Sequence, residues 1–285
     1  TYIDGKLTSN MNFTLYRENI FNSIRLLITG DYLHMTFDRR WETVGQIMTN
    51  SLKRSMAVFF SSLLLALCLG VLKGIFDSKK GKKTSTIKVL QTIVPLSVPD
   101  VLTIGLIQIV AYRLYVSKVT IFGIGPIPHG GTGNFLNAVY PVIALSLVPA
   151  AYIARITSTS IESTYEKDYV KAARGKGCSE IRIILNHAMK KVAADLIASF
   201  PAITSIMFSS LFIVEQIFYY RGITYEMIEI YGMPTTLFLE GGRAAEGVST
   251  ATAYLAFAVA LAVIYFILYT LLDIAKEILI PKLKS

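Results

Sequence analysis

Residues 55–76 read SMAVFFSSLLLALCLGVLKGIF, an apolar run with a single charged residue near its end. About 20 residues of α-helix rise about 30 Å, which matches the hydrocarbon thickness of a lipid bilayer. Comparable runs lie at 89–115, 135–156, 193–218 and 250–272. The sequence therefore predicts an all-α protein, a polytopic membrane helix bundle with five spans.

The composition supports a membrane protein and argues against a soluble enzyme. Of the 285 residues, 53% are hydrophobic and only 16% are charged. Soluble globular domains usually carry about 25% charged residues. The formal net charge of +9 would suit a nucleic-acid partner only if the basic residues gathered on one soluble surface, because net charge alone does not identify a partner.

The placement of the basic residues gives the topology instead. Loops of a multi-span chain alternate between the two sides, so 77–88, 157–191 and the tail after 272 share one side. This side is rich in lysine and arginine, whereas the loops at 116–134 and 219–249 hold only Lys118, Arg221 and Arg243. Because loops rich in lysine and arginine stay inside, the basic side is cytoplasmic. We expect a multi-pass protein of the bacterial plasma membrane with no nucleic-acid partner.

This topology divides the chain into two parts. Residues 1–52 form an extracytoplasmic N-terminal segment, and residues 53–285 form the transmembrane domain. A chain that starts outside needs an upstream membrane helix or an export signal, and no such segment precedes this polar start. We therefore expect a further membrane helix upstream of Thr1.

The cytoplasmic segment at 157–191 is long for a loop between two spans, and its pattern predicts a helix–turn–helix. Ala172 and Ala173 leave a bare helix surface, Gly177 permits a sharp turn, and Ser179 followed by Glu180 is typical of a helix start. Such a segment suits docking to a cytosolic protein. The alternative is a solvated basic loop held to anionic headgroups, at about 1 kcal/mol for each lysine or arginine.

The run DYVKAARGKGCSEIRIILNHAMKK at 168–191 resembles the EAA loop of binding-protein-dependent ABC importer permeases, closest to the oligopeptide, dipeptide and nickel family. Supporting similarities follow the family's order at 25–37, 43–51, 214–218 and 281–284. In that family a membrane helix precedes the external N-terminal segment, which agrees with the helix expected upstream of Thr1.

The resemblance implies the permease subunit of an ATP-driven importer that moves peptides or a similar small solute, a nickel chelate included, into the cell. Its partners would be cytosolic ABC ATPase subunits, a second permease in a heterodimer and an extracytoplasmic solute-binding protein. ATP and Mg²⁺ would bind to the ATPase partner, so this chain would hold no cofactor and no metal and would not be an enzyme.

The resemblance also assigns the ATPase-coupling residues, which lie in the EAA segment of the loop. This helix would sit in a groove of the ATPase and carry the closure of the ATPase to the membrane helices. The ATPase site and the transport site would then be coupled through one conformational equilibrium. The residues are Asp168, Tyr169, Lys171, Ala172, Ala173, Arg174, Lys176, Gly177, Ser179 and Glu180.

The chain departs from the family pattern at three places. Asp195 stands near the place where a proline usually follows the EAA helices, and Ile280 replaces an aspartate before the terminal proline. The glycine-rich element after the fourth span reads Arg221-Gly222-Ile223-Thr224, which retains one glycine. These departures indicate a divergent branch of the family.

Two other classes of function are compatible with parts of the sequence. A membrane scaffold or sensor could recruit a cytosolic partner through the basic loop without transport. An intramembrane enzyme would need paired catalytic groups within the spans, and none is present; a P-loop is also missing. Glu215, at the external end of the fourth span, could be functional or could lie at the level of the lipid headgroups.

Overall fold

The computed structural model of the protein describes residues 2–3, 6–7, 13–34, 42–78, 98–120, 123, 125–231, 239–240, 243–244 and 250–284. The chain forms two compact units. The first comprises Thr1–Leu52 and Glu226–Leu261, and the second comprises Lys53–Tyr225 and Ala262–Ser285.

The first unit holds the short elements near the N-terminus. Helix α1 (Phe13–Thr29) and the 3-10 helix η1 (Asp31–His34) follow one another through Gly30. It also holds two antiparallel pairs of short strands: β1 (Tyr2–Ile3) with β2 (Lys6–Leu7), and β3 (Leu239–Glu240) with β4 (Arg243–Ala244).

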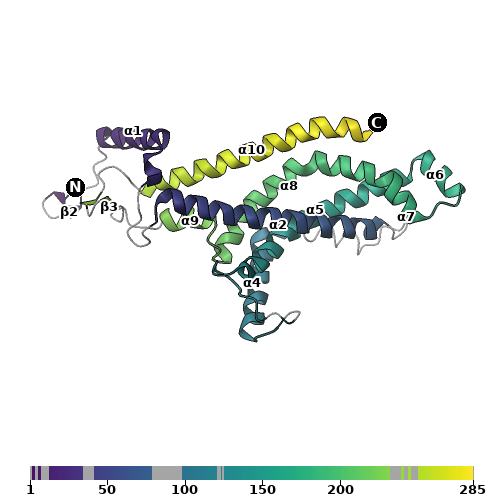
Figure 1. Cartoon of the computed structure of the whole chain (residues 1–285), viewed down its shortest axis with the longest axis horizontal. Helices are drawn as coiled ribbons and strands as arrows, with labels where there is room; N and C mark the ends of the chain where they lie inside the picture. Colours follow the sequence, from purple (N-terminus) through teal and green to yellow (C-terminus); the bar gives the residue numbers. More distant parts are fainter. Residues whose placement is uncertain are drawn as a thin grey trace. The chain divides into compact units, whose positions relative to one another are not determined.

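The second unit is helical and carries most of the membrane domain (Figure 1). Three helices have residues in both units: α2 (Val44–Ser78), α9 (Ile223–Tyr231) and α10 (Thr250–Lys284). The other elements of the second unit follow in chain order: α4 (Asp100–Val116), η2 (Phe135–Ala138), α5 (Val139–Tyr165), α6 (Asp168–Gly175), α7 (Glu180–Ile183), η3 (Ile184–Ala188) and α8 (Met189–Ile217).

Four helical segments are long and apolar enough to cross a membrane: Val44–Ser78, Phe135–Tyr165, Glu180–Ile217 and Ala253–Leu279. They coincide with the first, third, fourth and fifth spans expected from the sequence, and they confirm a polytopic membrane helix bundle. The sidedness of the bundle and the division at residue 53 stay predictions.

The second expected span, 89–115, is described only in part. Helix α4 has 17 residues and begins at Asp100, whereas residues 89–97 lie outside the described chain. Pro99 occupies the N-cap position of α4, where a proline costs little because its missing N–H would have no intrahelical partner.

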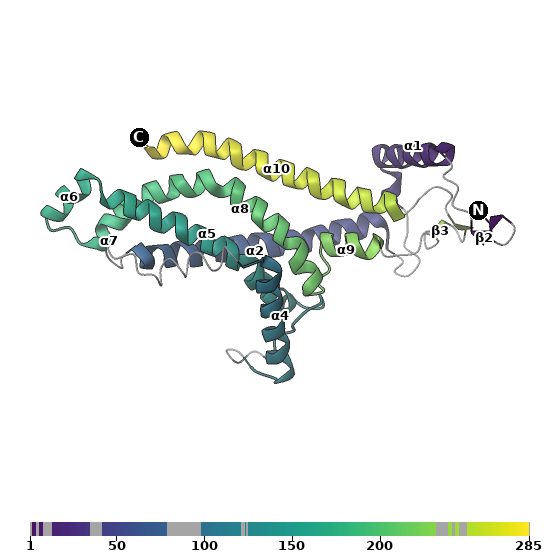
Figure 2. The ribbon, with the colours of Figure 1, turned by 180° about the vertical axis from the view of Figure 1, so that it is seen from behind.

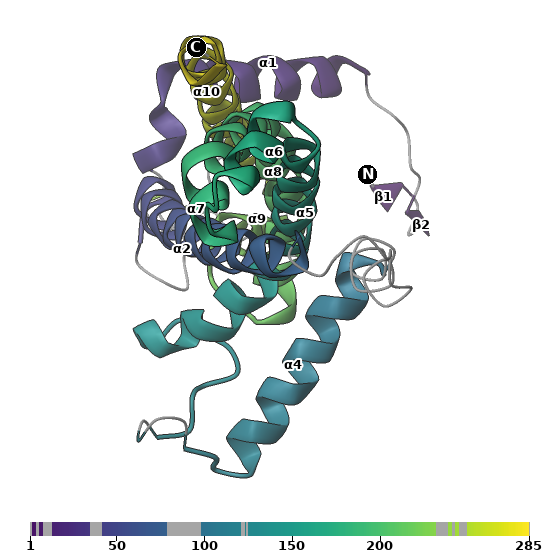
Figure 3. The same ribbon diagram turned by 90° about the vertical axis from the view of Figure 1, so that its right-hand side faces the viewer.

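Helices α5 and α8 form the centre of the second unit, where they pack side by side (Figure 2). Ile153 of α5 and Ile203, Met207 and Leu211 of α8 are fully buried in one apolar cluster. Helix α4 contacts both helices and extends away from them (Figure 3). The pair α5–α8 therefore gives a fixed base for the segment that connects them.

Helix α2 lies against α5 through two glycines one helical turn apart. A Cβ atom at Gly70 would lie 2.7 Å from Cβ of Ile153, and one at Gly74 would lie 2.5 Å from Cβ of Thr157. Small residues at a spacing of four let membrane helices approach closely and gain van der Waals contact. The close contact between the backbones of α2 and α5 therefore requires glycine at positions 70 and 74, and we call this pair a packing motif.

Candidate functional site

The segment between α5 and α8 is a helix–turn–helix, as the sequence predicts. Helix α6 runs from Asp168 to Gly175 and α7 from Glu180 to Ile183. A short π-helix, η3, joins α7 to α8. Both short helices lie at one end of the α5–α8 pair (Figure 1), so the connection is held by two buried helices.

Gly177 makes the turn that its sequence position suggests. Its φ is +79°, a left-handed conformation that costs glycine far less than other residues. The Gly177 N–H donates to the carbonyl of Arg174 at 2.9 Å, and the Cys178 N–H donates to the carbonyl of Ala173 at 3.1 Å. This pair of bonds is a Schellman motif, which satisfies the last carbonyls of α6.

Ser179 occupies the N-cap position of α7 in an extended conformation, with φ −66° and ψ 149°. This confirms the helix start expected at Ser179 and Glu180. The hydroxyl of Ser179 makes no capping hydrogen bond, so the start depends on backbone geometry and on acidic Glu180 in the first turn, next to the positive end of the helix dipole.

Arg174 ties the two short helices together. Its guanidinium lies 3.0 Å from the Glu180 carboxylate across the turn and 4.7 Å above the ring centre of Tyr165 at the end of α5. An exposed ion pair contributes only about 0.2–1 kcal/mol, and a cation–π contact adds about 0.5–1 kcal/mol at an exposed site. The sequence suggested Arg174 as a contact for another protein, yet within this chain it fixes the angle of α6.

The outer surface of α6 is open. Val170 is fully buried and anchors the helix, whereas Tyr169, Lys171 and Ala172 are exposed. A Cβ atom at Gly175 or Gly177 would meet nothing within 4 Å. Lys171 pairs with Asp168 at 2.8 Å within the first turn. The exposed surface of α6 therefore combines one aromatic ring and several charged side chains with small residues.

All ten coupling residues assigned from the sequence lie on this one segment. The described structure places them on α6, on the turn and at the start of α7. Lys176 is the C-cap of α6 and is exposed. Their role toward an ATPase stays a prediction.

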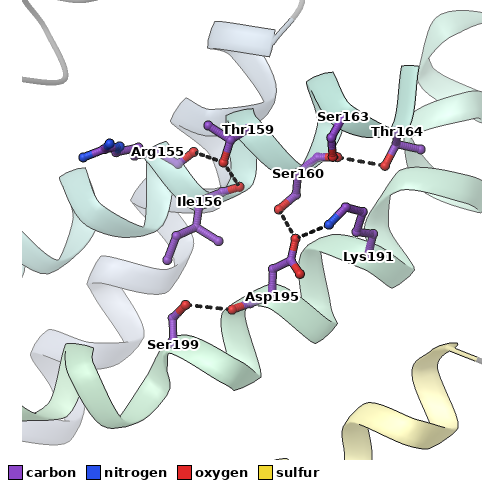
Figure 4. A network of polar contacts seen from close by, with 9 residues as sticks. All are labelled: Arg155, Ile156, Thr159, Ser160, Ser163, Thr164, Lys191, Asp195 and Ser199. Atoms are coloured by element: carbon purple, nitrogen blue, oxygen red, sulfur yellow. Dashed lines mark hydrogen bonds and ion pairs between the residues drawn. The ribbon is translucent and has the colours of Figure 1, made fainter. Parts of the chain in front are cut away.

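Asp195, near the place where the family pattern has a proline, forms a polar link between α5 and α8 (Figure 4). Its Oδ2 accepts a hydrogen bond from the Ser160 hydroxyl at 2.6 Å and pairs with Lys191 at 2.7 Å. The hydroxyl of Ser199 donates to the Asp195 carbonyl at 2.8 Å. A proline at position 195 could supply neither the interhelical hydrogen bond with Ser160 nor the ion pair with Lys191.

Glu215 is the second polar site in this unit, and it does not lie exposed at the headgroup level. Its side chain is fully buried. Oε2 accepts from the backbone N–H and hydroxyl of Thr224 at 2.9 and 2.5 Å and from the Tyr225 N–H at 3.2 Å. Oε1 accepts from the Ser55 hydroxyl at 2.5 Å. A Cβ atom at Gly222 would overlap the carboxyl group, which explains why one glycine is retained here.

The Glu215 carboxyl therefore caps the N-terminus of α9 from the end of α8. The first N–H groups of a helix lack intrahelical partners and carry partial positive charge. Ser55 completes the cap, because its hydroxyl also accepts from the Ile223 N–H at 2.7 Å. One carboxyl group thus joins α2, α8 and the start of α9; we name Ser55, Glu215, Thr224 and Tyr225 the Glu215 clamp.

Tyr220 lies beside this clamp in the link from α8 to α9. Burial raises the pKa of its hydroxyl, the nearby Glu215 carboxyl raises it further, and Arg54 lowers it. Raising the pKa of a phenol keeps it protonated through the physiological range. Tyr220 is thus a neutral residue here.

The comparisons with known proteins agree with this architecture. The sequence profile of the family described as "Binding-protein-dependent transport system inner membrane component" matches residues 46–285. The "Probable peptide ABC transporter permease protein y4tP" of Sinorhizobium fredii is 25% identical over 63% of this chain and 58% of its own length. The "Nickel import system permease protein NikB" of Staphylococcus aureus is 24% identical over 69% of this chain and 57% of its own.

This chain therefore spans less than two thirds of the length of these relatives. The crystal structure of an amino acid ABC transporter with histidines aligns with 83% of this chain and 94% of its own chain, with 14% identity and a TM-score of 0.50, which shows a shared fold. The match over residues 46–285 covers most of the sequence. The chain belongs to the family of binding-protein-dependent transport system inner membrane components and is a multi-pass protein of that membrane.

Proposed function

We propose that the protein is the permease subunit of an ATP-driven ABC importer that moves peptides into the cell. The observation that carries this proposal is the helix–turn–helix of α6 and α7. It is anchored on one side by buried Val170, and its other side is open. The name of the Sinorhizobium fredii relative supports peptides as cargo, and the name of the Staphylococcus aureus relative supports a nickel chelate as the second candidate.

The proposed assembly has a second permease, cytosolic ABC ATPase subunits and an external solute-binding protein. The ATPase would hold ATP and Mg²⁺ and carry out the hydrolysis, so the proposed role of this chain is conformational. Nucleotide binding to the ATPase would favour one arrangement of the membrane helices. The loaded solute-binding protein would favour the same arrangement from the external side of the membrane.

The shape of the segment supports a rigid coupling element. The Schellman motif at Gly177 fixes the turn, and the pair of Arg174 and Glu180 fixes the angle between α6 and α7. Helix α7 continues through η3 into α8. A displacement of α6 would therefore reach α8 directly, without a flexible linker.

An Ala172→Glu substitution tests the proposed ATPase contact. Ala172 is exposed, so the change leaves the fold intact but forces an unpaired charge into the proposed interface. A buried unpaired charge costs several kcal/mol, and a cost of about 3 kcal/mol lowers affinity about 100-fold. We expect the ATPase to co-purify with the unmodified protein from membranes and to be lost with the variant.

The control is Ser117→Glu, which adds the same charge at an exposed position on the predicted outer side. It should retain the ATPase in full. Equal retention by both variants would refute the contact at α6. Absence of an ATPase from every sample would remove the importer proposal and favour a scaffold or sensor.

A further inference from the structure

The segment between α5 and α8 carries more basic charge than its own carboxylates neutralise. Residues 168–191 contain six basic and two acidic side chains. Three of the basic side chains form ion pairs, at 2.8, 3.0 and 2.7 Å: Lys171 with Asp168, Arg174 with Glu180, and Lys191 with Asp195. Three cations of the segment are therefore left over.

These three cations, which we name the basic rim, are Lys176, Arg182 and Lys190. All three side chains are exposed, and none of them forms an ion pair or a hydrogen bond within the part of the chain that the structure describes. Lys176 is the C-cap of α6, Arg182 lies in α7, and Lys190 lies at the beginning of α8. Lys190 also lines a pocket of about 400 Å³ together with Tyr169 of α6. The basic rim therefore lies next to the exposed surface of α6.

The distance of the basic rim from the membrane argues against lipid headgroups as its partner. Residues 196–214 of α8 carry no charged side chain and rise about 28 Å, close to the hydrocarbon thickness. Glu180–Ile217 is one helical segment, so at about 1.5 Å per residue Lys190 lies about 9 Å before this stretch and Arg182 about 21 Å before it. Headgroup layers extend only about 5–8 Å beyond the hydrocarbon. The basic rim therefore reaches into the aqueous phase, where a soluble partner can bind it.

We propose that the basic rim binds acidic side chains of the cytosolic ATPase that surround the groove for α6. This inference rests on the proposed function and assigns a chemistry to the same interface. Opposite charges on two surfaces accelerate their association and fix the register of the complex. The exposed face of α6 would supply the close contact, and the basic rim would orient the ATPase before that contact forms. Cations that served only to keep the loop cytoplasmic would have no effect on ATPase binding.

The salt dependence of association is the first test and needs no variant. The full-length protein is assembled with its second permease in nanodiscs of zwitterionic phosphatidylcholine, and binding of the purified ATPase subunits is followed by biolayer interferometry. Raising KCl from about 50 to about 500 mM shortens the screening length from about 14 to about 4 Å. We expect the association rate constant to fall about tenfold, while the dissociation rate constant changes by less than about twofold. An association rate constant independent of salt would overturn the proposal.

Arg182→Glu assigns the salt effect to the basic rim, because it changes the charge by two units at an exposed position. We expect association at about 50 mM KCl to be about tenfold slower than for the unmodified protein, and the difference to shrink below about twofold at about 500 mM. Lys190→Glu changes a different helix and should show the same pattern, which separates a charge effect from a local distortion of α7.

Lys118→Glu is the matched control, since it makes the same charge change at an exposed position on the predicted outer side. It should leave the association rate constant within about twofold of the unmodified value at every salt concentration, because the membrane separates it from the ATPase. Equal losses for Arg182→Glu and Lys118→Glu, or unchanged rates for both Arg182→Glu and Lys190→Glu, would refute an acidic partner surface.

Failure of this proposal is distinguishable from failure of the proposed function. If the ATPase bound the unmodified protein but neither salt nor Arg182→Glu altered the association rate constant, the importer proposal would stand and the acidic contact would be wrong. If no ATPase bound at any salt concentration, both proposals would be wrong.

Discussion

Glu215→Ala should lower the free energy of unfolding by about 4 kcal/mol or more. The truncation leaves four donors of the Glu215 clamp without their acceptor in a fully buried site. A buried donor without a partner costs about 1–3 kcal/mol, and the cavity adds to this cost. Unfolding of the detergent-solubilised protein, followed by circular dichroism, measures the loss.

Two further variants distinguish the loss of the clamp's hydrogen bonds from the general effect of removing a carboxylate on the unfolding free energy. Glu162→Ala removes an exposed carboxylate of α5 and should change the unfolding free energy by less than about 0.5 kcal/mol. Glu215→Gln retains one acceptor oxygen but turns an amide donor toward other donors, so an intermediate loss of about 2–3 kcal/mol is expected. Equal effects of Glu215→Ala and Glu162→Ala would show that the clamp does not hold the helices.

Replacing both Gly70 and Gly74 by valine should prevent the close contact between α2 and α5. New side chains at these positions would overlap Ile153, Thr157 and the α5 backbone. Overpacking costs about 1–3 kcal/mol at each site, so the double variant should lose about 2–6 kcal/mol. The fraction of protein that elutes as a single species after solubilisation, together with its melting temperature, reports the effect.

Gly105→Val is the matched control for this substitution. Gly105 lies in α4, and a Cβ atom there would meet nothing within 4 Å. Valine has a higher helix propensity than glycine, so this variant should retain or slightly raise the melting temperature. A double Gly70→Val/Gly74→Val variant as stable as the Gly105→Val control would contradict the packing motif.

The membrane spans were predictable because the bilayer sets one length and one composition for every span. The four apolar helices found in the described chain overlap the expected ranges, although each extends beyond the apolar run. Helix α2, for example, begins at Val44, ahead of the run that starts at Ser55. Polar helical turns outside the hydrocarbon satisfy their own backbone and need no apolar pattern, so hydropathy does not locate their ends.

The turn of the coupling segment was also predictable, because only glycine adopts its backbone conformation cheaply. The pairing of Arg174 with Glu180 was not, since it joins residues six apart across a turn and no helical spacing indicates it. The clamp at Glu215 depends on Ser55, which lies 160 residues away in sequence. Contacts of this kind follow from how helices pack, which local sequence patterns do not determine.

The link between Asp195 and Ser160 illustrates the same limit. The sequence marks Asp195 as a departure from the family pattern, but the partner lies 35 residues away on α5. An aspartate close to a lysine at a spacing of four predicts the pair with Lys191, and this pair is present. The interhelical bond, which gives the substitution its structural effect, is visible only in the fold.

ATP-driven uptake in proteoliposomes tests the importer proposal most directly. The full-length protein is reconstituted with its second permease, the ATPase subunits and the solute-binding protein, and accumulation of a labelled peptide is followed with ATP or with a non-hydrolysable analogue. We expect ATP-dependent accumulation of the peptide, which Ala172→Glu should abolish and Ser117→Glu should retain. No ATP-dependent accumulation of peptide or nickel chelate by the assembled complex would contradict the importer proposal.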